Sequence, residues 1–576
     1  MKVLGISAFY HDSAAVIIED GRVVLAAQEE RFSGIKNDAA FPSSAIQFCL
    51  KESKTELSEL KAIVFYDKPF LKFERILETY LSQAPKGLVS FLKSMPIWIK
   101  DKLYIKRTIR QGLLPMMEGN GRLPKIYFPE HHLSHAASAY YPSGFDEALI
   151  LTVDGVGEYT TTSLAVGKGN SITQLRTMAF PDSLGLLYAA FTYYLGFRIN
   201  SGEYKVMGLS SYGDSKSKGF KDYYWKIKES LIQIHDDGSF KLNRKYFGFL
   251  TGLRMTKDKH WENLFGIKRR IKGEAISSKH QNLAKAIQVV TEEIFLKIAT
   301  EGKRLTDCTK ICLAGGVALN CVANGVLVRS GLFESIYIQP AAGDAGGAIG
   351  AALAYYHLSR PEAERKKTFS SVYLGPNPGA GQKEKAHSFK ENTFSDFDLL
   401  CEEVSSLLSQ GKVIGWVQGR MEFGPRALGN RSILADPRKD WMQDRINLKV
   451  KNREEFRPFA PVVLEEDAHK YFDTGEVKAS PFMLVTFPVI DQSIPAVTHV
   501  DGSARVQTVN QEQNEKLFML LKVFKETTGC SVLLNTSLNG KDQPIACGAE
   551  EALTIFAESQ LDYLVIKNTI FSKEWN

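Results

Sequence analysis

The chain contains 576 residues, which is too many for a single hydrophobic core, so we expect two or three domains. Its composition, 44% hydrophobic and 24% charged, is ordinary for a soluble globular protein and excludes a mainly membrane-embedded chain. The formal net charge of +7 suits anionic small molecules such as nucleotides, but by itself it does not indicate nucleic-acid binding.

The cysteines and the N-terminal residues bear on the cellular compartment. None of the seven cysteines forms a C-x-x-C pair, so neither a zinc knuckle nor a disulfide framework is indicated. Their odd number favours the reducing cytoplasm, and residues 1–18, interrupted by His11 and Asp12, do not resemble a signal peptide. No run of about 18 apolar residues occurs, so no membrane span is expected.

The N-terminus predicts three short strands. Segments 3–7, 13–18 and 22–27 are apolar, and Asp20-Gly21 between the last two is a hairpin signal. Such a meander opens the actin/Hsp70/sugar-kinase type of nucleotide-binding fold, although many other α/β proteins could begin in the same way.

His11 lies at the first turn between strands, in the sequence His11-Asp12-Ser13. In the actin/Hsp70 type of fold this turn faces the cleft, where a histidine could act as a general base on a hydroxyl. The alternative is a turn histidine without a catalytic role. Lys36, further along the chain, is a candidate anion contact of low specificity.

Residues 85–114 mix aromatic and aliphatic side chains with five basic residues between Lys100 and Arg110. An amphipathic helix pair with a solvated basic face explains this pattern. The alternative is a surface for a bulky anionic or lipid-linked substrate.

Two histidines form the first candidate metal-binding pair. His131 and His135 are four residues apart, so on a helix both imidazoles share one face and can reach a single ion. His132 points away from that face. An isolated pair of this kind is usually only a helix surface, so the interpretation depends on further ligands.

Two aspartates supply those ligands. Asp154 ends the apolar run 148–153, which predicts a buried strand, and Asp344 lies in a glycine-rich turn after a second run at 335–339. Two imidazoles and two carboxylates can together form a metal site.

Glycine-rich turns follow three predicted strands, and two of these turns lead into predicted helices. They follow residues 148–153, 310–313 and 335–339. The second turn leads into a helix through Asn324, and the third into a helix through Tyr356. Such turns direct backbone N–H groups and helix N-termini at an anion. The candidate phosphate-binding residues are Gly155, Gly157, Gly315, Gly316 and Asn320.

A second α/β domain is predicted after a linker. Residues 359–395 are rich in charge, proline and glycine, so we predict domains at 1–358 and 396–576. Within the second domain, residues 399–408 predict a helix that Gly411 stops, and residues 413–417 predict a strand. A helix near 550–558 and a strand near 563–566 close the chain, and no long internal repeat is evident.

The second domain is dense in arginine and lysine within irregular sequence. Residues 424–432 hold two arginines, and residues 447–461 hold four further cations before a rigid Pro-Phe-Ala-Pro. Guanidinium groups bind phosphate bidentately, so this density fits a substrate with several phosphates. The alternative is that the cations lie on solvated faces.

These residues resemble the O-carbamoyltransferase family of the NodU/CmcH type over nearly the whole chain. The matching stretches are residues 11–15, 130–137, 154–155, 203–208, 315–320, 343–347, 424–429, 457–461 and 535–537. The resemblance implies an N-terminal domain of the actin/Hsp70-like (ASKHA) type followed by a C-terminal YrdC-like α/β domain.

The resemblance further implies a one-carbon group transferase that works in two steps. The C-terminal domain would form carbamoyl adenylate from carbamoyl phosphate and ATP. The N-terminal domain would transfer the carbamoyl group to an acceptor hydroxyl at a divalent metal. Iron(II) is the implied ion, while the residues themselves suit iron, zinc or manganese.

Site residues are carried over by position. His131, His135, Asp154 and Asp344 would bind the metal directly or through water. His11 matches the catalytic histidine of the family, and Lys36 matches a nearby anion contact. The carbamoyl phosphate and ATP site would comprise Arg426, Lys451, Arg457, Arg505, Asn535 and Ser537.

Two other functions explain part of the sequence. A fusion of the tRNA threonylcarbamoylation type would need a basic RNA-binding face, which the net charge does not demand. A nucleotide-regulated binding module of the Hsp70 type would leave the histidine pair and the arginine-rich domain without a role. We therefore expect ATP, with magnesium, carbamoyl phosphate and a natural-product or glycan acceptor as partners, and no nucleic acid. The oligomeric state stays open, with a homodimer as one option.

Overall fold

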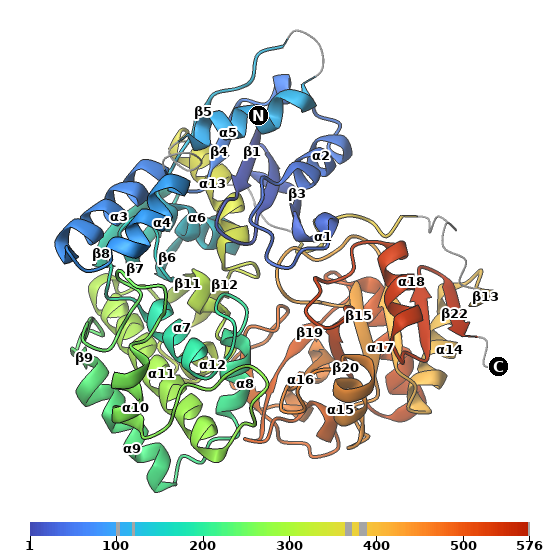
Figure 1. The fold of residues 1–576 in the computed structure, drawn as a ribbon. Coiled ribbons are helices and arrows are strands. Elements are labelled where there is room, and N and C mark those ends of the chain that lie inside the picture. Colours follow the sequence, from blue (N-terminus) through green and yellow to red (C-terminus); the bar gives the residue numbers. More distant parts are fainter. Residues whose placement is uncertain (99–103, 118–120, 363–370, 380–388, 574–576) are drawn as a thin grey trace. The chain divides into compact units, whose positions relative to one another are not determined.

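The computed structural model describes residues 1–98, 104–117, 121–362, 371–379 and 389–573. The chain divides into two compact units (Figure 1): unit 1 comprises Met1–Glu29 and Asn37–Ser370, and unit 2 comprises Glu30–Lys36 and Ser371–Asn576. Much of the linker predicted at 359–395 lies outside the described residues, and the predicted domain boundaries stay predictions. Because residues 30–36 group with unit 2, Lys36 does not lie in the unit that carries the glycine-rich turns.

Unit 1 begins with a five-stranded sheet. Its strands are β1 (Lys2–Ser7), β2 (Ala14–Glu19), β3 (Arg22–Gln28), β4 (Ala62–Phe65) and β5 (Ile126–Tyr127). Their order is β3-β2-β1-β4-β5, with β1 antiparallel to β2 and parallel to β4. The β2–β3 hairpin turns at Asp20 and Gly21, both at positive φ, as the Asp-Gly signal predicts. The three strands predicted at the N-terminus are therefore confirmed.

A second five-stranded sheet in unit 1 repeats this topology. Its strands are β6 (Glu147–Val153), β7 (Thr160–Lys168), β8 (Ser171–Ala179), β11 (Lys310–Ala314) and β12 (Ser335–Ile338). Their order is β12-β11-β6-β7-β8, and β6, like β1, is antiparallel to one neighbour and parallel to the other. The duplicated sheet is the actin/Hsp70-like architecture that the N-terminal meander predicts, although the sequence itself shows no long repeat.

Two helices pack between these sheets and against each other (Figure 1). Helix α6 (His131–Ser143) packs on β6 and β11, and helix α13 (Asp344–Leu358) packs on β1 and β2. A Cβ atom at Gly350 of α13 would lie 1.7 Å from the backbone oxygen of Ser134 in α6, so only glycine allows this approach. The close packing fixes the first turn of α13, which carries Asp344, next to the histidines of α6.

The other elements of unit 1 surround this core. They are α2 (Ser43–Glu52), α3 (Pro69–Gln83), α4 (Leu88–Ile97), α5 (Ile105–Leu113), α7 (Leu184–Tyr194), α8 (Glu203–Ser210), α9 (Lys218–Lys226), α10 (Asp258–Phe265), α11 (Ser278–Thr306), α12 (Cys321–Arg329) and the pair β9 (Ile232–Ile234) and β10 (Phe240–Leu242). The helix pair predicted within 85–114 is present as α4 and α5, although residues 99–103 between them lie outside the described part. No helix in the described ranges combines the length and the apolar character needed to cross a bilayer.

One predicted helix of unit 1 differs in its start. The helix expected after Gly316 is a 3₁₀ turn over Gly316–Leu319, and α12 begins only at Cys321. The physical reason is Asn320, whose side-chain oxygen accepts a hydrogen bond from the backbone N–H of Ala323 and so caps α12.

Unit 2 is a mixed α/β domain built on an eight-stranded sheet with the order β13-β22-β21-β14-β15-β20-β16-β19. The strands are β13 (Phe389–Thr393), β14 (Ile414–Val417), β15 (Arg431–Ala435), β16 (Ala460–Leu464), β19 (Gln507–Val509), β20 (Val532–Ser537), β21 (Tyr563–Ile566) and β22 (Thr569–Lys573). The helices include α1 (Glu30–Ser33), α14 (Phe397–Ser409), α17 (Glu515–Thr528) and α18 (Ala549–Glu558), and a small ladder joins β17 (Thr486–Pro488) to β18 (Ser503–Arg505). Helix α14 ends before Gly411, which has a φ of +81°, as its sequence predicts.

Candidate metal centre and anion site

The histidine pair lies at the first turn of α6. His131 is the first residue of the helix, and its Nε2 lies 3.1 Å from the Nε2 of His135, so the predicted shared face is present. His132 turns away, and its Nδ1 lies 3.0 Å from Oγ of Ser163 in β7. The two imidazoles therefore present one nitrogen each to the same point, while the third is used in packing.

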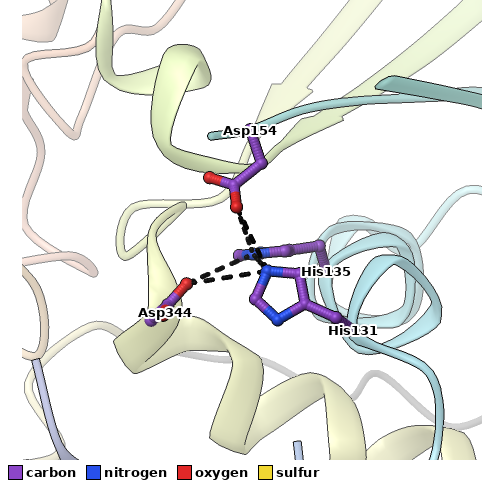
Figure 2. A group of neighbouring side chains, drawn as sticks. All are labelled: His131, His135, Asp154 and Asp344. Carbon is purple, nitrogen blue, oxygen red and sulfur yellow. Dashed lines mark hydrogen bonds and ion pairs between the residues drawn. The ribbon is translucent and has the colours of Figure 1, made fainter. Parts of the chain in front are cut away.

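Two aspartates meet the histidines at that point (Figure 2). Oδ2 of Asp154, just beyond the end of β6, lies 3.1 Å from Nε2 of His131 and 3.9 Å from Nε2 of His135. Oδ1 of Asp344, the first residue of α13, lies 3.8 Å and 3.6 Å from the same two nitrogens. One ligand atom from each of the four residues lies within 4.8 Å of the others. The structure thus brings together all four predicted metal ligands.

This set of four side chains fits a divalent ion. Ligand atoms bound at about 2.1 Å lie roughly 3.0–3.4 Å apart around one ion, and the closer pairs here approach that spacing. Both histidines also keep a buried Nδ1 that has no hydrogen-bond partner among the described residues, so neither ring is committed elsewhere. Two imidazoles with two carboxylates suit iron, zinc or manganese and do not distinguish between them.

The electrostatics of the four residues favour a cation at this point. Burial alone would raise the pKa of Asp154, but the hydrogen bond with His131 and the charge of His135 hold that pKa well below its usual range. Burial acts in the same way on Asp344, and there the charge of His11 and the hydrogen bond with His135 lower the pKa. The two carboxylates therefore stay ionised and attract either protons on the imidazoles or a metal ion.

His11 lies beside this centre. Its Nε2 is 3.6 Å from Oδ2 of Asp344, and its Nδ1 is 3.0 Å from Oδ2 of Asp12, whose other oxygen accepts from Nδ2 of Asn37 at 2.7 Å. Burial lowers the pKa of His11, but the charges of Asp344 and Asp12 outweigh it and raise that pKa to about 10. When Asp344 is engaged as a metal ligand, its charge no longer contributes fully to this increase.

Three further groups hold the ligands in place. The hydroxyl of Tyr66 donates to Oδ2 of Asp344 at 3.0 Å, and the backbone N–H of Gly316 donates to Oδ1 of Asp154 at 2.9 Å. The carboxylate of Glu158 accepts from the backbone N–H of His131 at 3.0 Å and so caps α6 from a distant loop. Sequence reasoning identified only Gly316, as a phosphate contact; the position of Tyr66 directly after the apolar strand 62–65 was the available signal for the tyrosine.

The other glycine-rich turn residues have mainly structural tasks in this arrangement. Gly157 packs against the rings of His131 and His132, since a Cβ there would lie 3.1 Å and 3.2 Å from them. Gly315 has a φ of +87° and lies against the backbone of Val153. A Cβ added at Gly155 would have no atom within 4 Å, so this side of the turn is open.

Asn320 is also occupied by protein contacts. Its amide exchanges two hydrogen bonds with the side chain of Gln288, at 3.0 Å and 3.1 Å, in addition to capping α12. Its predicted role at a phosphate stays a prediction.

Unit 2 gathers its predicted cations around Lys451. This lysine is buried, and its Nζ donates to Oδ1 of Asn539 at 2.6 Å and to the backbone oxygen of Ser537. Burial lowers the pKa of Lys451, and the nearby charges of Arg453, Arg457 and Lys36 lower it further. Lys36 therefore lies within electrostatic range of this cluster. Arg453 also belongs to the cluster, although the family resemblance did not predict it as a site residue.

The remaining predicted residues of unit 2 lie around the same cluster. Burial and the charges of Arg457 and Arg505 lower the pKa of Arg453, and Arg426 similarly lowers the pKa of Arg457. Glu454 and Asp542 offset part of this repulsion at Arg457. Cations thus outnumber carboxylates here, which is the charge balance of a site for a polyanion.

Two polar residues complete the surroundings of the cluster. Nδ2 of Asn535 donates to Oε1 of Gln507 at 2.8 Å, while its Oδ1 is buried without a hydrogen-bond partner among the described residues. Oγ of Ser537 donates to Oδ1 of Asn539 at 2.8 Å. Arg431, by contrast, uses its guanidinium on backbone oxygens such as those of Cys547 and Gln418, so it is structural.

The fold and the two sites define a class of protein: an actin/Hsp70-like α/β unit with a candidate divalent metal centre, joined to an α/β unit with a cationic cluster. Comparison with known proteins agrees with this class. A family model described as "Carbamoyltransferase N-terminus" matches residues 2–353, and one described as "Carbamoyltransferase C-terminus" matches residues 405–573. The chain belongs to the carbamoyltransferase family of the NodU/CmcH type and is therefore an enzyme.

Individual relatives support this assignment, the first two below over nearly the whole chain. An uncharacterized protein of Synechocystis (sll1178) is 46% identical over 99% of this chain and 96% of its own. Nodulation protein NolNO of Sinorhizobium fredii is 38% identical over 99% of this chain and 81% of its own. The 3'-hydroxymethylcephem-O-carbamoyltransferase of Streptomyces clavuligerus is 39% identical over 44% of this chain and 47% of its own.

Proposed function

We propose that this carbamoyltransferase is ATP-dependent and works in two steps, one in each unit. The C-terminal domain, predicted at 396–576 and YrdC-like, forms carbamoyl adenylate from carbamoyl phosphate and ATP. The N-terminal domain, predicted at 1–358, transfers the carbamoyl group to an acceptor hydroxyl. The observation that carries this proposal is the presence of two unlike sites, a four-ligand centre in unit 1 and a buried cation cluster in unit 2.

The cation cluster suits the first step because the reactants are anionic. Carbamoyl phosphate releases its phosphate with one water to give carbamate, and carbamate then attacks the α-phosphate of magnesium-bound ATP and releases pyrophosphate. Arg426, Arg457 and Arg505 can hold phosphate oxygens bidentately, and Lys451 adds a point charge. Asn535 offers an uncommitted oxygen to the carbamoyl amide.

The second step breaks the bond between the carbamoyl carbon and the adenylate oxygen and forms a bond to the acceptor oxygen. An ion bound by His131, His135, Asp154 and Asp344, which we propose is iron(II), would polarise the carbamoyl oxygen and neutralise charge on the leaving phosphate. Once binding of the ion by Asp344 lowers the pKa of His11 enough to leave its Nε2 unprotonated, that nitrogen takes the proton of the acceptor hydroxyl, while Asp12 bonds to Nδ1 on the other side of the ring. Adenosine monophosphate leaves with the bonding electrons.

The acceptor is a small molecule or glycan with a free hydroxyl. The relative named 3'-hydroxymethylcephem-O-carbamoyltransferase supports a hydroxyl acceptor. Mass spectrometry of a panel of hydroxylated acceptors, supplied with carbamoyl phosphate and ATP, would identify the compound that gains one carbamoyl group.

The division of labour is tested with two variants and one exchange assay. We expect His131→Ala to lose bound metal and transfer but to keep carbamoyl phosphate-dependent ATP–pyrophosphate exchange, because the exchange belongs to unit 2. We expect Arg457→Ala to keep the metal and to lose exchange. Loss of exchange in folded His131→Ala, or retained exchange in Arg457→Ala, would refute the assignment of the two steps.

A further inference from the structure

Helix α4 and a neighbouring loop of unit 1 form an exposed apolar surface. Leu88, Val89 and Leu92 of α4 and Leu253 of the loop are each between 60 and 71% exposed. Large aliphatic side chains exposed together mark an interaction surface rather than ordinary variation in burial. Leu81, near the end of α3, is 75% exposed and adds to the apolar area before the turn into α4.

Protein contacts hold the helix and the loop together. Oγ of Ser90 donates to the backbone oxygen of Thr251, and a Cβ at Gly87 would lie 2.5 Å from Cβ of Thr251. Helix α4 lies beside α3 (Figure 1). It is fixed there because the rings of Tyr80 and Phe91 pack edge to face with their centroids 5.3 Å apart. The surface is therefore a fixed part of unit 1.

The same two segments are strongly cationic. Residues 81–98 and 241–257 together contain seven lysines and arginines and no aspartate or glutamate. Their summed charge of +7 equals the formal net charge of the whole chain, so the rest of the chain is neutral. Lys86 lies close enough to Lys257 to lower its pKa, after the larger effect of burial. Among the described ion pairs of these segments, Arg254 bonds to Asp258 at 3.3 Å.

We propose that this surface docks on an anionic phospholipid bilayer. We call it the α4 surface; it consists of Lys86, Leu88, Val89, Leu92, Lys93, Leu253, Arg254 and Lys257. Aliphatic side chains flanked by lysines are what an interfacial membrane site requires, because the apolar groups enter the acyl boundary while the cations reach anionic headgroups.

Charge favours this occupant over two others. A second copy of the chain in a two-fold contact would bring the same cations face to face, which is repulsive. A nucleic acid would use the cations but would leave the leucines exposed, since its backbone offers them no apolar partner. Anionic lipid satisfies both components at once.

The test uses the full chain and vesicles. We expect cosedimentation with vesicles of equal parts phosphatidylcholine and phosphatidylglycerol, little with phosphatidylcholine alone, and a decrease as sodium chloride is raised. Leu88→Asp/Leu92→Asp should lower the partition coefficient at least about tenfold. Lys86→Glu/Lys93→Glu should lower it at least about 25-fold, since each cation near an anionic surface contributes roughly fivefold.

Matched controls lie on exposed positions of unit 2. Leu399→Asp on α14 and Lys522→Glu on α17 should bind vesicles like the parent protein, and circular dichroism establishes that all variants are folded. Equal binding to both vesicle types, or equal losses in the controls, overturns the proposal. If the parent protein does not bind vesicles and light scattering shows that Leu88→Asp/Leu92→Asp changes the oligomeric state, the α4 surface binds a protein partner instead. None of these outcomes depends on the proposed two-step reaction.

Discussion

Replacing Gly350 by alanine is expected to impair the metal centre although every ligand residue stays in place. Gly350 lies where α13 crosses α6, and an added Cβ would lie 1.7 Å from the backbone oxygen of Ser134 and 2.7 Å from the backbone nitrogen of Ser138. Ser134 is flanked by the two histidine ligands on α6, while Asp344 begins α13. A change in the separation of the helices therefore changes the distance between ligands.

The size of the displacement follows from the contact. Real Cβ atoms do not approach other atoms closer than 3.0 Å, so the helices must separate by about 1.3 Å from the 1.7 Å position. Metal–ligand distances tolerate about 0.2 Å, so the displacement exceeds the tolerance several-fold. Overpacking against backbone costs up to about 3 kcal/mol, and alanine returns about 1 kcal/mol of helix propensity. We therefore expect a modest net loss of about 2 kcal/mol in unfolding free energy together with a large loss of metal affinity.

Metal content after reloading with iron(II) measures the loss of metal affinity. Chemical denaturation of the metal-free protein measures the loss of unfolding free energy. Gly343→Ala is the matched control, because Gly343 precedes Asp344 in the same turn, has a φ of −73° and has nothing within 4 Å of an added Cβ. Parent-like iron content in Gly350→Ala would refute the idea that the α6–α13 crossing sets the ligand geometry. Equal losses in both glycine variants would refute it as well.

Two further predictions concern buried charge. Lys72→Met should lower the unfolding free energy by about 3–5 kcal/mol, because Asp67 is fully buried and Lys72 is the partner of its Oδ2. Adding Asp67→Leu should restore most of the loss, and denaturation curves that show no recovery would contradict this. Pyrophosphate at about 100 times its dissociation constant should stabilise the protein by about 2.7 kcal/mol through the cation cluster. Arg457→Ala should weaken this stabilisation. Thermal unfolding in which pyrophosphate has no effect on the parent protein would contradict the proposal that the cluster is an anion site.

Local patterns were sufficient to predict that the four candidate metal ligands lie together. The spacing of His131 and His135 depends only on the period of an α-helix, and the structure confirms that the two rings converge. Asp154 and Asp344 were recognisable because each follows an apolar strand segment. In a sheet with parallel β6, β11 and β12, the loops after those strands meet at one edge, so their acids meet as well.

Groups that reach the site from distant segments were not predictable in this way. Glu158 caps α6 from a position 27 residues later, and Tyr66 contacts Asp344 across 278 residues. Neither interaction leaves a periodic pattern in the sequence, since each depends on how whole elements pack. Asn320 shows that one residue type fits two interpretations: an asparagine after a glycine-rich turn predicts a ligand contact, and the structure shows it as the N-cap of α12, so the ligand contact stays a prediction.

The arginines of unit 2 show why composition alone overstates an anion site. Arg431 and Arg426 lie in one short motif, yet Arg431 donates to backbone oxygens and Arg426 acts electrostatically on Arg457. The difference is one of surroundings: the guanidinium of Arg431 donates to several backbone oxygens, whereas that of Arg426 lies within electrostatic range of another cation, Arg457.

The same reasoning about charge bears on the two steps that we propose for the two units. In unit 1 the buried carboxylates of Asp154 and Asp344 stay ionised, so with neutral imidazoles the site has an excess of negative charge, and this selects a cation. In unit 2 the unbalanced charge is positive, because Lys451 and Arg453 are buried among further cations, and this selects a polyanion. A single site could not hold both an excess of carboxylates and an excess of cations. The opposite charges would neutralise each other, and the site would favour neither a metal ion nor a polyanion. The reaction that we propose makes a phosphorylated anhydride and uses it at a metal, and two sites of opposite charge suit that division.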